Sequence, residues 1–88
     1  LLKLSKEFLQ ENKMTLFEAH ENKKYKVITI QTQDEELRDR FLALGITKDT
    51  EIFLERFSSN KDTLAIQVHH SKIALRSSEA QHIIVEAV

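Results

Sequence analysis

The four histidines are the side chains of this sequence best suited to bind a metal ion or to transfer protons near neutral pH. His69 and His70 are adjacent, and adjacent side chains of an extended strand point to opposite faces, so the pair is badly placed to chelate one ion. In a turn the two could converge, but a metal site would still need a third ligand. The sequence does not reveal where His20 and His82 lie relative to this pair. The sequence therefore predicts solvated turn histidines and no metal site.

An acidic run at residues 34–36 could supply carboxylate oxygens to a hard metal ion. A helix start explains the same charge without a metal, because negative side chains are favoured at the positive end of a helix dipole. Thr32 followed by Glu35 fits a capping box with Thr32 at the N-cap. The spacing also predicts solvent-side ion pairs Glu35–Arg38 and Glu36–Arg40. We therefore predict a helix N-terminus here and no metal ligand.

Sequence motifs for covalent catalysis and for nucleotide binding are missing. The chain has no cysteine, which excludes thiol nucleophiles, thiolate metal ligands and disulfides. Its serines stand in no Gly-x-Ser-x-Gly arrangement. With a single glycine it cannot form a Walker loop or a dinucleotide-binding glycine pattern. The sequence therefore predicts no catalytic residue, no cofactor and no enzymatic activity.

Length and charge limit the class of protein further. A chain of 88 residues forms one domain with a small core. Its net charge of -1 and pI of about 6.5 do not indicate nucleic-acid binding, for which a clustered basic face and a pI above about 9 are typical. No apolar run approaches the roughly 20 residues of a membrane helix. A small basic cluster is formed by Lys23, Lys24 and Lys26. We interpret it as a solvated turn, or as a site that contacts lipid headgroups or an acidic partner.

The clearest helix of the sequence follows the acidic run. Leu37, Phe41 and Leu44 fall on one face at i, i+4 and i+7. Gly45 and Ile46 predict a Schellman ending, in which the glycine takes a left-handed conformation and the isoleucine contacts Phe41. A β-branched residue in place of Gly45 should strain this ending.

Two pairs of residues could contact a partner protein. Leu42 lies roughly 100° from Phe41 around the helix, so it either borders the core or offers an apolar anchor beside Arg38. Arg76 and Glu79 flank the last turn of the chain and form either a structural pair or a contact surface. A desolvated arginine is a common interface anchor. The candidate partner-binding residues are therefore Arg38, Leu42, Arg76 and Glu79.

The remaining segments favour an all-β fold. Strands are expected at residues 25–30, 50–57, 63–68, 72–76 and 83–86, with one helical turn at 15–19 capped by Thr15. Five short strands separated by close turns indicate a small barrel with one short helix. Residues 1–13 have helical spacing and are expected to form an N-terminal extension, and residues 14–88 to form the domain.

Several short elements of the sequence occur in an order typical of one family. They are Met14-Thr15-Leu16, LRDRFLALG at residues 37–45, IALRSSEA at 73–80 and IIV at 83–85. Over residues 14–88 this order resembles the ferrous iron transport protein A family, FeoA. The family often has glycine near Asp49, at residues 60–62 and near His70 and Ser71, where this chain has none. Asn and Asp tolerate left-handed turns better than most residues, so the fold can be kept.

The resemblance implies an SH3-like β-barrel of five strands in the cytoplasm. It further implies an accessory role beside the large ferrous iron transporter, a membrane protein with a cytosolic GTP-binding domain. The protein would bind the cytosolic part of that transporter at the inner face of the membrane, and would alter its assembly or activity. It would carry no iron itself.

Other interpretations remain open at this point. The alternative is an SH3-like regulatory domain of an iron-dependent transcriptional repressor, although the chain lacks a helix-turn-helix segment and a metal-binding dimerisation domain. A generic SH3 domain would dock proline-rich peptides on an aromatic-lined groove, yet this chain has no tryptophan and one tyrosine. Self-association into a homo-oligomer through exposed apolar residues is a further alternative.

Overall fold

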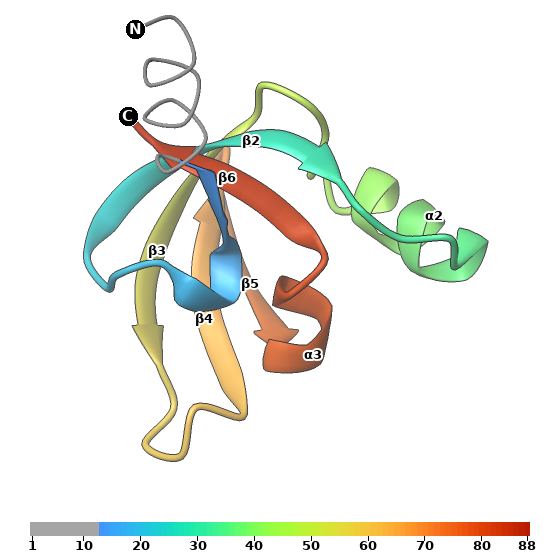
Figure 1. Cartoon of the computed structure of the whole chain (residues 1–88). Helices are drawn as coiled ribbons and strands as arrows, with labels where there is room; N and C mark the ends of the chain where they lie inside the picture. The colour runs from blue at the N-terminus through green and yellow to red at the C-terminus, as the bar shows by residue number, and fades with distance from the viewer. Residues whose placement is uncertain (1–12) are drawn as a thin grey trace, which may run out of the picture.

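The computed structural model describes residues 13–88, which form strands, two short α-helices and one 3₁₀ helix (Figure 1). In chain order the elements are β1 (Lys13–Thr15), η1 (Leu16–Glu18), β2 (Lys23–Ile30), α2 (Glu35–Ala43), β3 (Glu51–Phe57), β4 (Thr63–Val68), β5 (Ser71–Arg76), α3 (Ser77–Ala80) and β6 (Ile83–Ala87). The N-terminal extension expected at residues 1–13 lies outside the described residues except for Lys13. Across residues 13–88, no helix has the length and apolar character needed to span a membrane.

Six antiparallel strands form one sheet in the order β1-β6-β2-β3-β4-β5. The predicted all-β fold with one short helix is confirmed, but the sheet has one strand more than expected. The additional strand, β1, pairs Lys13 with Glu86 and Thr15 with Ile84. A strand of three residues is too short for side-chain alternation to reveal it in the sequence.

The sheet curls around a single apolar core (Figure 1). Its register shifts between Val27 and Thr29 and between Leu54 and Arg56, and such bulges bend a sheet. The alternation predicted for residues 63–68 is confirmed in β4, where every second side chain is buried. The fully buried large side chains are Tyr25, Phe41, Leu16, Ile46, Ile52, Leu54, Leu64, Ile66, Leu75, Ile83, Val27 and Val68.

Among residues 13–88, four residues other than glycine have a positive φ angle, and two of them stand where the resembling family often has glycine. Asp49 (71°) and Lys61 (60°) lie at the expected turns. In the third turn the residue is His69 (57°), not His70 or Ser71. Asn22 (63°) is the fourth. The chain therefore keeps the turn geometry with side chains for which the left-handed region is costly.

The turn that contains Lys61 is held by a contact between aromatic rings and an ammonium group. The rings of Phe17 and Phe57 meet edge to face, 6.1 Å apart and 86° inclined. The Lys61 Nζ atom lies 4.7 Å from the Phe17 centroid and 4.5 Å from the Phe57 centroid. This cation–π arrangement ties η1 to the β3–β4 connection and helps to close the barrel.

The lysine cluster lies on a strand, not in a turn as the sequence predicted. Strand β2 begins at Lys23, two residues earlier than expected, so that Lys23, Lys24 and Lys26 are all strand residues. The reason is pairing: Lys23 lies opposite Leu54 and Lys24 opposite Phe53 in β3. Polar side chains can occupy the solvent face of an antiparallel strand without weakening its buried face.

Candidate functional site

Helix α2 stands to one side of the barrel and carries two of the four candidate residues (Figure 1). Phe41 is its one buried residue, and the Leu37 side chain is half-buried. The Leu42 side chain is 56% exposed, and within residues 13–88 only Val88 shares with it the character of a large exposed hydrophobic residue. The structure therefore places Leu42 in solvent and not at the border of the core.

The C-terminal end of α2 is fixed to the barrel as the sequence predicted. The Ile46 N–H donates to the Phe41 carbonyl oxygen at 2.8 Å, and the Gly45 N–H donates to that of Leu42 at 3.0 Å. Gly45 has φ +83°, which confirms the Schellman ending. Phe41 and Ile46 are both fully buried, and the Thr50 hydroxyl donates to the Gly45 carbonyl oxygen at 3.3 Å. These contacts orient the exposed face of the helix.

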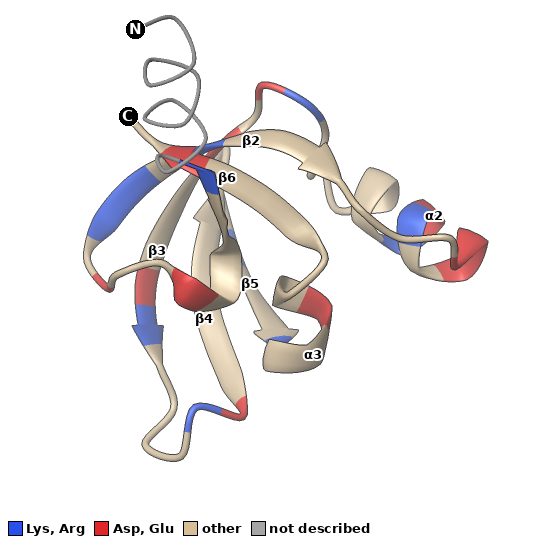
Figure 2. Cartoon of the chain, in the orientation of Figure 1, with Lys and Arg blue, Asp and Glu red and all other residues tan. Residues whose placement is uncertain are grey.

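The N-terminal end of α2 differs from the prediction. The N-cap is Asp34, whose Oδ1 atom accepts the Leu37 N–H at 3.2 Å. Thr32 is instead two residues upstream, where its hydroxyl accepts the Asp34 N–H at 3.1 Å. Threonine and aspartate are both good N-cap residues, so the sequence alone allowed the helix to start after Thr32 or after Asp34. In Figure 2 the ribbon of α2 is red, for acidic residues, at this end and has blue segments, for basic residues, further along.

Arg38 and Arg40 do not form the ion pairs predicted within the helix. Among the described residues, neither Glu35–Arg38 nor Glu36–Arg40 lies within ion-pair distance. An Arg38 Nη2 atom donates to the Thr32 carbonyl oxygen at 2.5 Å, so this guanidinium holds the β2–α2 connection. Exposed pairs along a helix contribute only about 0.2–0.5 kcal/mol, and bonds to other partners outweigh them here.

An ion pair joins α2 to α3 through Arg40, which the sequence predicted to pair with Glu36. The Arg40 Nε atom donates to Glu79 Oε2 at 2.8 Å, and the side chains are 48% and 16% exposed. The other Glu79 oxygen accepts the Arg76 backbone N–H at 2.9 Å. Arg76 and Glu79 thus form a structural pair through a hydrogen bond from the Arg76 backbone. The Arg76 side chain is exposed, and the ion pair with Glu79 is formed by Arg40 instead.

These bonds set the charge state of Glu79. Burial raises the pKa of Glu79, but the Arg76 N–H and the Arg40 guanidinium together outweigh burial and hold it below its ordinary value. A carboxyl group whose pKa is lower in the folded than in the unfolded chain stabilises the fold above the unfolded pKa. That contribution is lost as the pH falls through the folded pKa of Glu79.

We expect Glu79→Gln to lower the free energy of unfolding by about 1 kcal/mol at pH 7, because it removes the charge from two hydrogen bonds at a partly exposed site. The loss relative to wild type should shrink as the pH falls from 7 toward 3, because wild-type Glu79 becomes increasingly protonated as the pH approaches its lowered folded pKa. Urea unfolding at both pH values measures it, with Glu36→Gln on the exposed side of α2 as the control. An equal loss at both pH values would contradict the ion pair.

The histidines do not gather at one place. Within residues 13–88 no three His, Asp or Glu side chains form a group that could hold a metal ion. His69 and His70 are exposed in the β4–β5 turn, and His20 is exposed before β2. His82 is half-buried, with its Nδ1 atom 3.0 Å from the Gln31 carbonyl oxygen, so it links the start of β6 to the end of β2.

Comparison with known proteins identifies the family. Residues 14–87 match the model of the FeoA domain. A Helicobacter pylori protein named as Fe(2+) transport protein A is 38% identical over 73 residues, which cover 83% of this chain and 96% of that protein. The chain belongs to the FeoA family. It is a FeoA-family accessory protein of ferrous iron transport, as the resemblance in its sequence indicated.

Solved FeoA structures have the same fold. A FeoA-like protein from Clostridium acetobutylicum is 31% identical, with 88% of each chain covered and a TM-score of 0.80. FeoA from Stenotrophomonas maltophilia, described as a prokaryotic SH3 domain protein complexed with zinc, is 28% identical with a TM-score of 0.73 over 83% of this chain and 89% of that one. The predicted SH3-like fold is therefore confirmed.

Transcriptional repressors share this fold as well. A manganese-dependent repressor superposes with a TM-score of 0.80 over 86% of this chain and 42% of the repressor chain, at 18% identity. Identity this low shows the fold alone, since unrelated functions use the same fold. The family match, and not the fold, assigns this chain to ferrous iron transport.

Proposed function

We propose that this FeoA protein is a cytoplasmic, non-enzymatic partner of the large ferrous iron transporter. It binds the cytosolic part of that membrane protein and alters its assembly or activity without carrying iron. The observation that supports this role best is the exposed Leu42 on a helix that projects from the barrel. Large apolar side chains are costly to leave in water, and an isolated one on a rigid helix suits a docking contact.

The surroundings of Leu42 favour a specific contact. Arg38 lies one turn earlier on the same side of α2, where residues at i and i+4 are neighbours. Its guanidinium is already fixed to the Thr32 carbonyl oxygen, so less rotamer freedom remains to be lost on binding. An apolar anchor beside an arginine is the composition of many interface hot spots.

The second half of the proposed surface lies on α3. Arg76 is exposed at the start of this helix, and Glu79 is held by Arg40 of α2. This ion pair keeps the two helices in a fixed relation, so a partner could contact both. We therefore assign partner binding to Arg38, Leu42, Arg76 and Glu79.

The test is binding of the 88-residue chain to the purified cytosolic part of the transporter from the same organism. The double variant Arg38→Ala/Leu42→Ala should weaken binding by at least roughly 30-fold, the effect of losing about 2 kcal/mol at a hot spot. Glu36→Ala, on another side of the same helix, is the matched control and should bind like wild type.

Each other outcome has a defined meaning. Wild-type binding that the double variant retains would keep the accessory role and reject the α2 surface. If the wild-type chain does not bind the transporter, the proposed role fails. A pulldown from lysate then shows whether a DNA-binding protein is recovered instead, as the repressor-domain alternative requires.

A further inference from the structure

Strand β5 is the last strand of the sheet, and the edge that it leaves open has a definite pattern of backbone groups. Within residues 13–88 it pairs with β4 and with no other strand. In an antiparallel pair, alternate residues exchange hydrogen bonds with the partner strand, and the residues between them direct their N–H and C=O groups to the opposite side. Every second residue of β5 therefore faces the open edge with its backbone.

Two hydrogen bonds show which residues these are. The Ser77 N–H, directly after β5, donates to the carbonyl oxygen of the residue before β4 at 2.8 Å, and so continues the ladder between the two strands. The Arg76 N–H points the other way and donates to the Glu79 carboxylate at 2.9 Å. By the same alternation, Lys72 and Ala74 direct their backbone groups to the open edge.

The open edge at these two residues is exposed. Within the described part of the chain, no hydrogen bond from another element reaches the backbone of Lys72 or Ala74, and both residues are exposed. Ile73 lies between them on the core side but is only half-buried, whereas Ile66, its partner in β4, is fully buried. A strand added to this edge would complete the hydrogen bonds and would cover Ile73.

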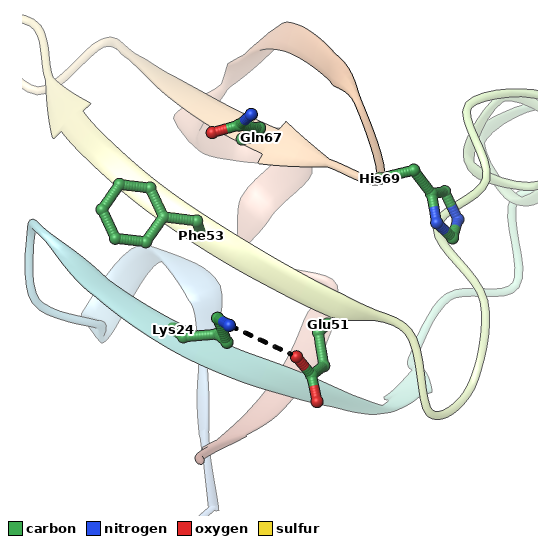
Figure 3. Close-up of a pocket in the computed structure, with 5 residues that line it drawn as sticks. All are labelled: Lys24, Glu51, Phe53, Gln67 and His69. Carbon is green, nitrogen blue, oxygen red and sulfur yellow. Dashed lines mark ion pairs between the residues drawn. The ribbon is translucent and has the colours of Figure 1, made fainter.

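Charge is distributed unevenly over the outer face of the sheet. On the β2 side, the Lys24 Nζ atom lies 3.7 Å from Glu51, and the Lys26 Nζ atom lies 4.0 Å from Asp49. Figure 3 shows the first of these ion pairs and the ring of Phe53 beside it. Because each of these two lysines has a carboxylate of its own, they offer no excess charge to a partner.

On the β5 side, positive charge is in excess. Three cationic side chains surround Ala74 on the outer face: Lys72 and Arg76 of β5, and Arg56 in the same row across β4. Of the nearby carboxylates, Glu55 lies 3.7 Å from the Lys72 Nζ atom, and Glu79 is paired with Arg40. The three cations thus face one carboxylate that has no other cation. A hollow of about 380 Å³ borders Ala74 and leaves room for added side chains.

We infer that the open edge of β5 binds an extended segment of a partner protein with the pattern acidic–apolar–acidic. Added as an antiparallel strand, the segment would place its apolar residue opposite Ile73 and its acidic residues opposite Lys72 and Ala74. The first acid would meet the Lys72 ammonium directly, and the second would lie between Lys72 and Arg76, its diagonal neighbours. Main-chain hydrogen bonds would hold the segment, and its three side chains would give the selectivity.

A second copy of this chain fits the edge poorly. Hydrogen bonds can join two β5 strands in several antiparallel registers, but each brings Lys72 or Arg76 directly opposite or diagonal to a cation of the other copy. Lysine on an open edge is a common protection against such self-pairing. A nucleic acid has no peptide backbone to continue the sheet. The inference does not rest on the transporter role, although Arg76 belongs to both surfaces.

The probe is the blocked peptide Ac-TTEVETT-amide, titrated into the isotopically labelled 88-residue chain and followed by NMR. We expect a dissociation constant on the order of 0.1–1 mM, because the segment is short and must be ordered on binding. At saturation, amide exchange of Lys72 and Ala74 should slow by at least roughly tenfold. If neither amide slows at about 5 mM peptide, the inference is overturned, while the transporter role is untouched.

Methylation of the peptide separates strand addition from charge attraction and leaves the protein unchanged. N-methylation of both glutamates removes the N–H groups that would bond to the edge, and should weaken binding at least about tenfold. N-methylation of the central valine alters an N–H on the far side of the added strand, and should leave binding close to that of the unmodified peptide. Equal effects of the two modifications would overturn the strand addition.

Charge exchange tests the selectivity. The peptide Ac-TTKVKTT-amide should bind the wild-type chain at least about tenfold more weakly than the glutamate peptide. Lys72→Glu/Arg76→Glu should reverse that preference, and a misfolded chain could not gain affinity for the lysine peptide. Lys24→Glu/Lys26→Glu, on the β2 side of the same face, is the matched control and should keep the wild-type preference. Equal binding of both peptides to the wild-type chain would overturn the acidic pattern.

Discussion

Truncation of Phe41 to alanine should lower the free energy of unfolding by about 3–5 kcal/mol, the usual cost of removing a buried aromatic ring. Phe41 is fully buried and is the one residue of α2 that enters the core completely. A chain of this length has a total stability of roughly 4–13 kcal/mol at typical values per residue. The variant should therefore lose a large share of the stability of the chain, and at the lower end of this range it would be close to unfolding at 25 °C.

The neighbouring Leu42 provides the matched control. Leu42→Ala removes a large apolar side chain from the same helix, but the leucine is 56% exposed, so the loss should be below about 0.5 kcal/mol. Urea unfolding followed by circular dichroism compares the two variants, and the midpoint should fall for Phe41→Ala with little change in slope. Losses of equal size at the two positions would mean that α2 does not sit on the barrel as described.

Local patterns predicted those parts of the fold that depend on neighbouring residues. The end of α2 is an example, because glycine is the residue best able to adopt φ +83° and Ile46 follows it directly. The alternation in β4 is another, since one face of that strand is buried and the other is not. In both cases the information lies within a few consecutive residues.

Competition between equally good local signals explains the misplaced helix start. Thr32 and Asp34 are both good N-cap residues, and the neighbouring sequence does not favour one position over the other. In the folded chain the Thr32 carbonyl oxygen accepts a bond from Arg38, and the Thr32 hydroxyl orders Asp34. Thr32 therefore stabilises the β2–α2 connection, and Asp34 is the N-cap of the helix.

The candidate site was predictable in part. The helical period marked Leu42 as lying off the core stripe, but its exposure depends on how far α2 stands from the sheet, which is a tertiary property. The Arg40–Glu79 ion pair joins residues 39 positions apart, so no local spacing predicts it.

Replacement of Gly45 by valine should lower the free energy of unfolding by about 2–4 kcal/mol, and replacement by alanine by about 1–2 kcal/mol. Gly45 has φ +83°, a conformation that costs every residue with a Cβ atom and costs β-branched residues most. Gly45→Asn should be the mildest change, because asparagine tolerates the left-handed region better. Thermal or urea unfolding of the three variants gives the order.

A second contribution must be separated from the φ angle. A Cβ atom at position 45 would lie 3.3 Å from Cδ2 and 3.5 Å from Nε2 of His69, a contact that is tight but borders a movable ring. We therefore expect most of the cost of Gly45→Ala to persist when His69 is also replaced by alanine, with a coupling energy below about 0.5 kcal/mol. If the cost disappears in the His69→Ala background, the contact and not the backbone conformation explains the need for glycine. That result would make the β4–β5 turn, and not the Schellman ending, the feature that keeps α2 in place.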